Sequence, residues 1–229
     1  KGANSVAGNT VLGASALDAT VSGGDNTAIG QAALTELTSG ANNTAVGHDT
    51  LRSTTTGSNN TALGSNALDQ NTTASNNTAI GKDALENNTT GSANVAVGAD
   101  ALETNTTGIR NVAVGRLALD VNTTADNNTA IGYNTLGANT TGTKNVALGA
   151  TALDANTTAN DNTALGYAAL TANTTGTGNT AVGGESVLGS NSTGSNNTSV
   201  GYQSLTTNTT ASNNTAVLLS AVVFANKAP

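Results

Sequence analysis

The sequence predicts an all-β protein, a parallel β-solenoid (β-roll) of about 13 coils with 17 residues per coil. Three observations predict it: a fixed 17-residue period, an asparagine at one position of every copy, and Gly and Asn-Thr-Thr segments that would interrupt a helix in each copy. Short β-rich pieces separated by Gly and Asn are typical of a solenoid coil. The repeat therefore indicates the architecture before any single residue is considered.

A motif glycine marks the period along the chain. It recurs every 17 residues from Gly13 to Gly183 and then, after 18 residues, at Gly201. The extra residue lies near Gly184, where we expect a one-residue bulge. Terminal repeats of a stack are usually atypical. We therefore expect an N-terminal cap over residues 1–8, regular repeats over 9–212, and a degenerate last coil with an apolar cap or assembly segment over 213–229.

Each copy carries an asparagine four residues before the motif glycine. Stacked coils place equivalent side chains about 4.8 Å apart, so these amides are predicted to pair as a ladder. The predicted ladder residues are Asn43, Asn60, Asn77, Asn94, Asn111, Asn128, Asn145 and Asn162. The glycine is expected at a corner that needs a positive φ or a close backbone approach. The predicted corner residues are Gly47, Gly64, Gly81, Gly98, Gly115 and Gly132.

Strand alternation assigns the two sides of the segment Thr78-Ala79-Ile80. Thr78 and Ile80 share one side and Ala79 takes the other. The Thr position is Val in three copies, so we expect that side to be the interior, joined by Leu85. The alanines would then form a long apolar strip outside, and such patches usually mark a partner surface. The alternative that stays open is a thin coil in which the alanines are also interior. The proposed self-association face comprises Ala45, Ala62, Ala79, Ala96, Ala113, Ala130, Ala147 and Ala164.

Composition excludes several classes of function. The net charge of −7 argues against nucleic-acid binding, which needs a basic surface. No apolar run reaches the length of a membrane span, so we expect no membrane insertion. There is one histidine, His48, and no carboxylate pair stands out from the repeating rows, so we do not expect an enzyme. The chain begins at Lys1 without a methionine, and we expect a processed chain or an excised segment.

Other repeat positions carry candidate ligand contacts. Tyr133, Tyr167 and Tyr202 directly follow a motif glycine and form a possible ligand edge for a glycan or receptor, although scattered surface aromatics would look the same. Acidic residues recur five positions after the glycine, which favours a solvated edge and leaves calcium open, with no other cofactor expected. Many Asn-Thr-Thr segments fit the glycosylation pattern, but a stacked asparagine would be inaccessible. The acidic row comprises Asp18, Asp69, Glu86, Glu103, Asp120 and Asp154.

The motif Asn-Thr-Ala followed by Ile, Val or Leu and Gly resembles the head repeats of trimeric autotransporter adhesins. The longer unit over residues 196–205 resembles repeats of marine bacterial and phage tail-fibre proteins. The resemblance covers about residues 9–218. It implies a trimeric β-roll or β-solenoid shaft that displays, or reaches toward, a receptor at a cell or virion surface.

These observations predict a structural extracellular fibre, filament or adhesin shaft that associates with itself as a trimer or filament. One alternative is an ice-binding solenoid that uses regularly spaced threonines. A second alternative is a glycan-binding module of a tail fibre, whose partner would be a cell-surface glycan or receptor.

Overall fold

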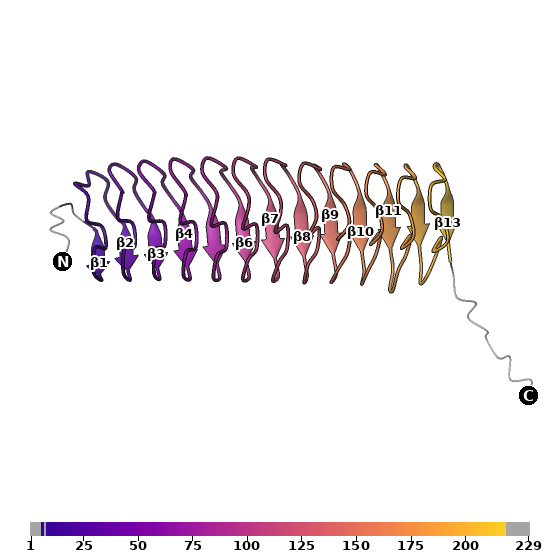
Figure 1. The fold of residues 1–229 in the computed structure, drawn as a ribbon, viewed down its shortest axis with the longest axis horizontal. Coiled ribbons are helices and arrows are strands. Elements are labelled where there is room, and N and C mark those ends of the chain that lie inside the picture. The colour runs from indigo at the N-terminus through magenta and orange to yellow at the C-terminus, as the bar shows by residue number, and fades with distance from the viewer. Residues whose placement is uncertain (1–5, 7, 219–229) are drawn as a thin grey trace, which may run out of the picture.

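The protein is a straight stack of 13 coils, each with one three-residue strand (Figure 1). The computed structural model describes Val6 and residues 8–218. The prediction of an all-β parallel solenoid is confirmed, and the described residues contain no helix. At the usual strand spacing the 13 coils form a rod roughly 60 Å long. The strands are β1 (Thr10–Leu12), β2 (Thr27–Ile29), β3 (Thr44–Val46), β4 (Thr61–Leu63), β5 (Thr78–Ile80), β6 (Val95–Val97), β7 (Val112–Val114), β8 (Thr129–Ile131), β9 (Val146–Leu148), β10 (Thr163–Leu165), β11 (Thr180–Val182), β12 (Thr198–Val200) and β13 (Thr215–Val217).

The strands form one parallel sheet in sequence order, with every repeat position in register with itself. β-Branched residues at the first and often the third strand position favour the extended backbone. Hydrogen bonds between coils continue outside the sheet. Leu85 N donates to Ala101 O at 3.0 Å, and Thr89 N donates to Thr106 O at 2.9 Å. The backbone is therefore paired with its neighbours along most of the perimeter of each coil, and this pairing needs the donors that proline lacks.

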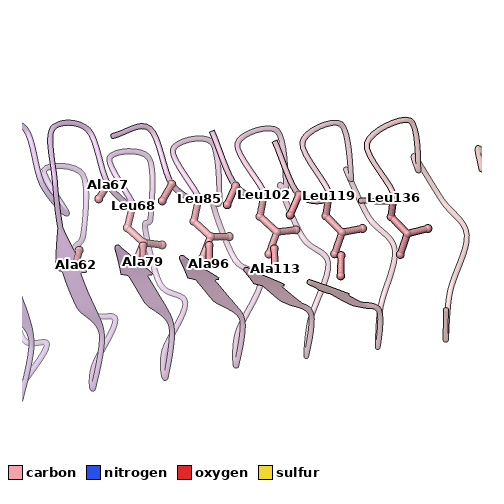
Figure 2. Packing of buried hydrophobic residues seen from close by; sticks show 14 of the residues in the cluster. Ala62, Ala67, Leu68, Ala79, Leu85, Ala96, Leu102, Ala113, Leu119 and Leu136 are labelled. Carbon is pink, nitrogen blue, oxygen red and sulfur yellow. The ribbon is translucent and has the colours of Figure 1, made fainter. Parts of the chain in front are cut away.

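The prediction of which strand side is interior is wrong. The central alanine of the strand points inward, as Ala79 and Ala96 do (Figure 2). The first and third strand positions lie outward; Ile80, for example, is 37% exposed. Each coil is too thin to enclose larger strand residues, because the opposite wall already supplies a leucine. An exposed alanine face, and self-association through it, are thereby excluded. The buried residues are Ala45, Ala62, Ala79, Ala96, Ala113, Ala130, Ala147 and Ala164, each 0% exposed.

The opposite wall brings an alanine and a leucine into the interior, three and four residues after the glycine. Ala84 and Leu85 are both 0% exposed. Leu85 has a φ of 53°, in the left-handed region, which costs about 1–2 kcal/mol for a residue with a Cβ. Burial of a leucine side chain contributes about 1.5–3 kcal/mol, which offsets that cost. The interior therefore consists of stacked Ala and Leu columns that run along the rod (Figure 2).

The predicted asparagine ladder is confirmed. Asn94 is completely buried; its backbone N–H donates to Asn77 Oδ1 at 2.8 Å, and its Nδ2 donates to Gly108 O at 2.8 Å. A second ladder runs through the Asn-Thr-Thr segments, where Asn105 Nδ2 donates to Asn88 Oδ1 at 2.8 Å. Two columns of buried amides thus satisfy backbone groups that the thin coil would otherwise leave unpaired.

The corner glycine is required by both backbone conformation and space. Gly81 has a φ of 138°, and a Cβ at this position would lie 2.5 Å from Gly98 O in the next coil. No side chain fits such a contact. The six predicted corner glycines have φ values from 135° to 145°, and with the equivalent glycines of the other coils the range is 114° to 148°.

The extra residue of the eleventh coil lies in the corner after β11 rather than within a strand. β11 and β12 stay in register, with Thr180 opposite Thr198. Glu185 and Ser186 adopt positive φ values in that corner. Leu170 N then donates to Val187 O, which restores the stacking. The expected bulge is therefore a widened corner.

The two predicted end segments lie largely outside the described residues. Of the segment 1–8, the structure describes Val6 and Gly8; of 213–229 it describes residues 213–218, which include β13. Both predictions on caps remain predictions.

Candidate functional surfaces

The candidate functional surfaces of this protein run along the outside of the rod. The described residues form no pocket and hold no group of three or more His, Cys, Asp or Glu side chains placed to bind a metal ion. Within the same residues, no helix is long and apolar enough to cross a membrane. Four rows of side chains run along the rod, and each is a candidate surface.

The outer sheet face consists of the first and third residues of every strand, β1 to β13. The first position is Thr or Val and the third is Ile, Val or Leu, so the face carries no charged residue along its whole length. The third-position side chains are partly exposed; Leu63 is 48% and Leu148 is 42% exposed. Their apolar surface is contiguous from coil to coil because the strands are in register. This face replaces the alanine strip as the apolar surface of the rod.

The threonine row lies nine residues after the corner glycine. Thr90 is exposed, whereas the preceding Thr89 is half-buried and donates its hydroxyl to Thr106 O at 3.0 Å. One threonine of each pair is thus used for coil stacking and the other faces solvent. The uninterrupted part of the exposed row comprises Thr56, Thr73, Thr90, Thr107, Thr124, Thr141, Thr158, Thr175, Thr193 and Thr210. Thr193 lies ten residues after its glycine because its coil contains the extra residue.

The acidic edge concentrates charge on the coils of β4 to β7. Asp69 is almost fully buried and lies beside Arg52, with Nε 2.9 Å from Oδ1 and Nη2 2.9 Å from Oδ2. Burial raises the pKa of Asp69 despite this cation and the hydrogen bond from Gln70. Burial, followed by the neighbouring carboxylate Asp120, also raises the pKa of Glu103. Burial and neighbouring acidic groups therefore raise the pKa of carboxyls along this edge.

Burial raises the pKa of the remaining carboxylates in this row as well. For Glu86 the charges of Asp83 and Asp69 add to the effect of burial. For Asp120 the charge of Asp100 adds to it. Asp100 has a cation close by, since Arg116 Nε lies 3.7 Å from its Oδ2, and Lys82 forms an ion pair with Asp83. Local cations therefore neutralise part of the edge.

The tyrosine edge consists of Tyr133, Tyr167 and Tyr202. All three side chains are exposed, at 51%, 61% and 57%. They belong to the coils of β8, β10 and β12, so one coil lies between successive tyrosines. Tyr202 Oη donates to Glu185 Oε2 at 2.9 Å, and this acceptor raises the pKa of Tyr202. The structure therefore places the predicted ligand edge in one line along the rod.

The stacked asparagines are poor glycosylation acceptors in the folded rod. Asn88 and Asn105 are completely buried, and each Nδ2 is used in a hydrogen bond. The sequence-based prediction covers one asparagine ladder and does not include this second one. The sequence does carry a signal for it, because this asparagine recurs in nine consecutive copies, from Asn71 to Asn208.

No protein-family model matches the chain, and no curated protein is significantly similar to it.

Proposed function

We propose that this protein is a structural rod, the shaft of an extracellular or virion-surface fibre or adhesin, and that copies of it associate side by side through the outer sheet face. The observation that carries the proposal is the uncharged outer sheet face, whose third strand position is Ile, Val or Leu in all 13 strands. A rod with no pocket among its described residues, and with every repeat position in register, is suited to spanning distance.

A second copy of the same chain is the occupant that fits this face best. Its Thr/Val and Ile/Val/Leu rows repeat at the same spacing, so two copies match coil by coil over their whole length. The net charge of −7 makes copies repel each other elsewhere, and the outer sheet face lacks that charge. A face about 60 Å long and three residues wide offers roughly 600 Å² per copy, close to the size of a specific interface.

The resemblance of the repeat to those of trimeric autotransporter adhesin heads and of tail fibres supports the same proposal. In those families the shafts are trimers at a cell or virion surface. We propose the trimer as the form of this association, with three outer sheet faces turned toward a common axis.

Sedimentation velocity of the purified chain tests the proposal. We expect the wild type to be an oligomer at micromolar concentration. The double variant Leu63→Lys/Leu148→Lys places two charges on the outer sheet face, and we expect it to be a monomer with unchanged circular dichroism. The matched control, Thr73→Lys/Thr158→Lys, adds the same charge to the threonine row of the same two coils and should remain an oligomer. A monomeric wild type, or equal dissociation of both variants, would refute the proposal.

A second candidate function is ice binding, which the exposed threonine row favours. Ten consecutive coils present a threonine hydroxyl and methyl at one position from Thr56 to Thr210, on a backbone held by coil-to-coil hydrogen bonds. Measurement of thermal hysteresis and ice recrystallisation inhibition decides this candidate. If the row binds ice, Thr107→Lys should abolish both effects, whereas Leu63→Lys should not; absence of both effects in the wild type removes the candidate.

A further inference from the structure

All three tyrosines of the chain occupy one repeat position. The chain has 2% aromatic residues, yet Tyr133, Tyr167 and Tyr202 each follow a corner glycine directly and are all exposed. None contributes to the interior, which consists of Ala, Leu and a few Val side chains. A structural role in packing therefore does not account for them.

The spacing of the tyrosines is set by the coils. Successive tyrosines are two coils apart, which corresponds to about 10 Å at the usual strand spacing. The residues between them in the row are small, Ala150 and Gly184. A Cβ added to Gly184 would meet only Tyr202 Cδ2, at 3.8 Å. Tyrosines and small residues therefore alternate along this row.

The ring of Tyr202 is held along the axis of the rod. Its hydroxyl bonds Glu185 on the preceding coil at 2.9 Å, and its ring edge lies above Gly184. The Tyr202 side chain is 57% exposed, so solvent reaches much of the ring. An exposed aromatic ring is a suitable stacking platform, because it combines a large apolar area with few rotatable bonds.

An extended β-1,4-linked sugar chain matches this arrangement. Each pyranose advances by about the height of one coil, and successive rings are turned over by half a turn. Every second sugar therefore presents the same apolar C–H face, and every second coil carries a tyrosine. Gln203 directly follows Tyr202 and is exposed, so its amide can bond sugar hydroxyls. The net charge of −7 favours an uncharged polymer over an acidic one.

We propose that the tyrosine edge binds an extended, uncharged β-1,4-linked polysaccharide of glucose or N-acetylglucosamine, with one sugar per coil and the rings of Tyr133, Tyr167 and Tyr202 under alternate sugars. The tyrosines follow the corner glycine and lie outside the strands that form the outer sheet face. The inference does not rest on the proposed association of copies.

Depletion assays with cellulose and chitin, together with calorimetric titration of cellohexaose and chitohexaose, test the proposal. We expect the wild type to bind at least one of the two polymers and its hexamer. Tyr167→Ala removes the middle ring and should weaken binding about tenfold. His48→Ala is the matched control, because His48 occupies the same repeat position on the coil of β3 and is exposed. It should bind like the wild type.

Amylose serves as the control ligand, because its α-1,4 linkage curls the chain and breaks the match to alternate coils; we expect no binding to it. Failure of the wild type to bind either β-1,4 polymer would overturn the proposal, and so would unchanged binding by Tyr167→Ala. Sedimentation of the same samples separates the two proposals, since Tyr167→Ala should keep the oligomeric state of the wild type while losing affinity.

Discussion

Removing one ladder amide from the middle of the stack should destabilise the rod far more than removing a surface amide. Asn94 is 0% exposed and bonds both neighbouring coils. In Asn94→Ala, the backbone N–H of Asn111 loses its acceptor, Asn94 Oδ1, which lies 2.9 Å away. Gly108 O loses the bond from Asn94 Nδ2 but keeps one from Asn105.

The magnitude follows from these two losses. A buried donor left without a partner costs about 1–3 kcal/mol, and the lost bond to a carbonyl that remains paired costs about 1 kcal/mol. We therefore expect Asn94→Ala to lower the free energy of unfolding by about 2–4 kcal/mol. The matched control is Asn127→Ala. Asn127 is exposed with a φ of 60°, and Ala93 occupies the same repeat position with a φ of 61°. The control should change the free energy by less than about 1 kcal/mol.

Urea unfolding followed by far-UV circular dichroism measures both variants. The comparison uses the unfolding midpoint and slope of each, because a stack of repeats can lose cooperativity when one coil is weakened. A midpoint for Asn94→Ala that equals that of Asn127→Ala would refute the role of the ladder in stability.

Three further predictions concern the interior, the corner and the acidic edge. Ala79→Val should lower the free energy of unfolding by about 1–3 kcal/mol, because it overpacks the thin coil. Ala99→Val changes a partly exposed position and should have little effect. Equal effects of the two variants in urea unfolding would contradict the assignment of Ala79 to the interior. Gly98→Ala should cost at least about 2 kcal/mol because the φ of 139° excludes a side chain, whereas Gly184→Ala, with open space around it, should be tolerated. The raised pKa of Glu103 means that the folded state binds its proton more strongly than the unfolded state. Glu103→Gln should therefore stabilise the protein at pH 7, and its gain in free energy of unfolding over the wild type should shrink as the pH falls through the pKa of Glu103. An equal gain at pH 7 and at about pH 4, measured by urea unfolding, would contradict the raised pKa.

The period, the first ladder and the corner glycine could be predicted because each depends on a contact between identical positions of neighbouring coils. A residue that stacks on its own copy cannot vary without disturbing two neighbours. Asn77 and Gly81 therefore show their roles in the sequence alone. The stacking geometry then follows from strand spacing, which is the same in every parallel sheet.

The inside and outside of the strand could not be assigned by hydrophobicity. Ile80 is more apolar than Ala79, yet Ile80 faces out and Ala79 is completely buried. The deciding quantity is the thickness of the coil, which depends on how close the opposite wall brings Leu85. The strand pattern carries no information on that distance. The near-uniform size of the alanine position was the available clue, since packing restricts size more strictly than it restricts polarity.

The tyrosine edge could be predicted from the sequence only in part. The sequence placed Tyr133, Tyr167 and Tyr202 at one repeat position, and the period placed them in a line. The hydrogen bond from Tyr202 Oη to Glu185 Oε2 and the position of the ring beside Gly184 are shown only by the structure.

Site-specific disulfide formation tests most directly whether copies meet at the outer sheet face. The chain has no cysteine, so a single introduced thiol reports on its own position. Leu148→Cys places it on the outer sheet face, and Thr158→Cys places it on the threonine row of the same coil. Under mild oxidation at micromolar concentration, we expect cross-linked chains from Leu148→Cys and almost none from Thr158→Cys. No cross-linking of Leu148→Cys, or equal yields from both variants, would contradict the account.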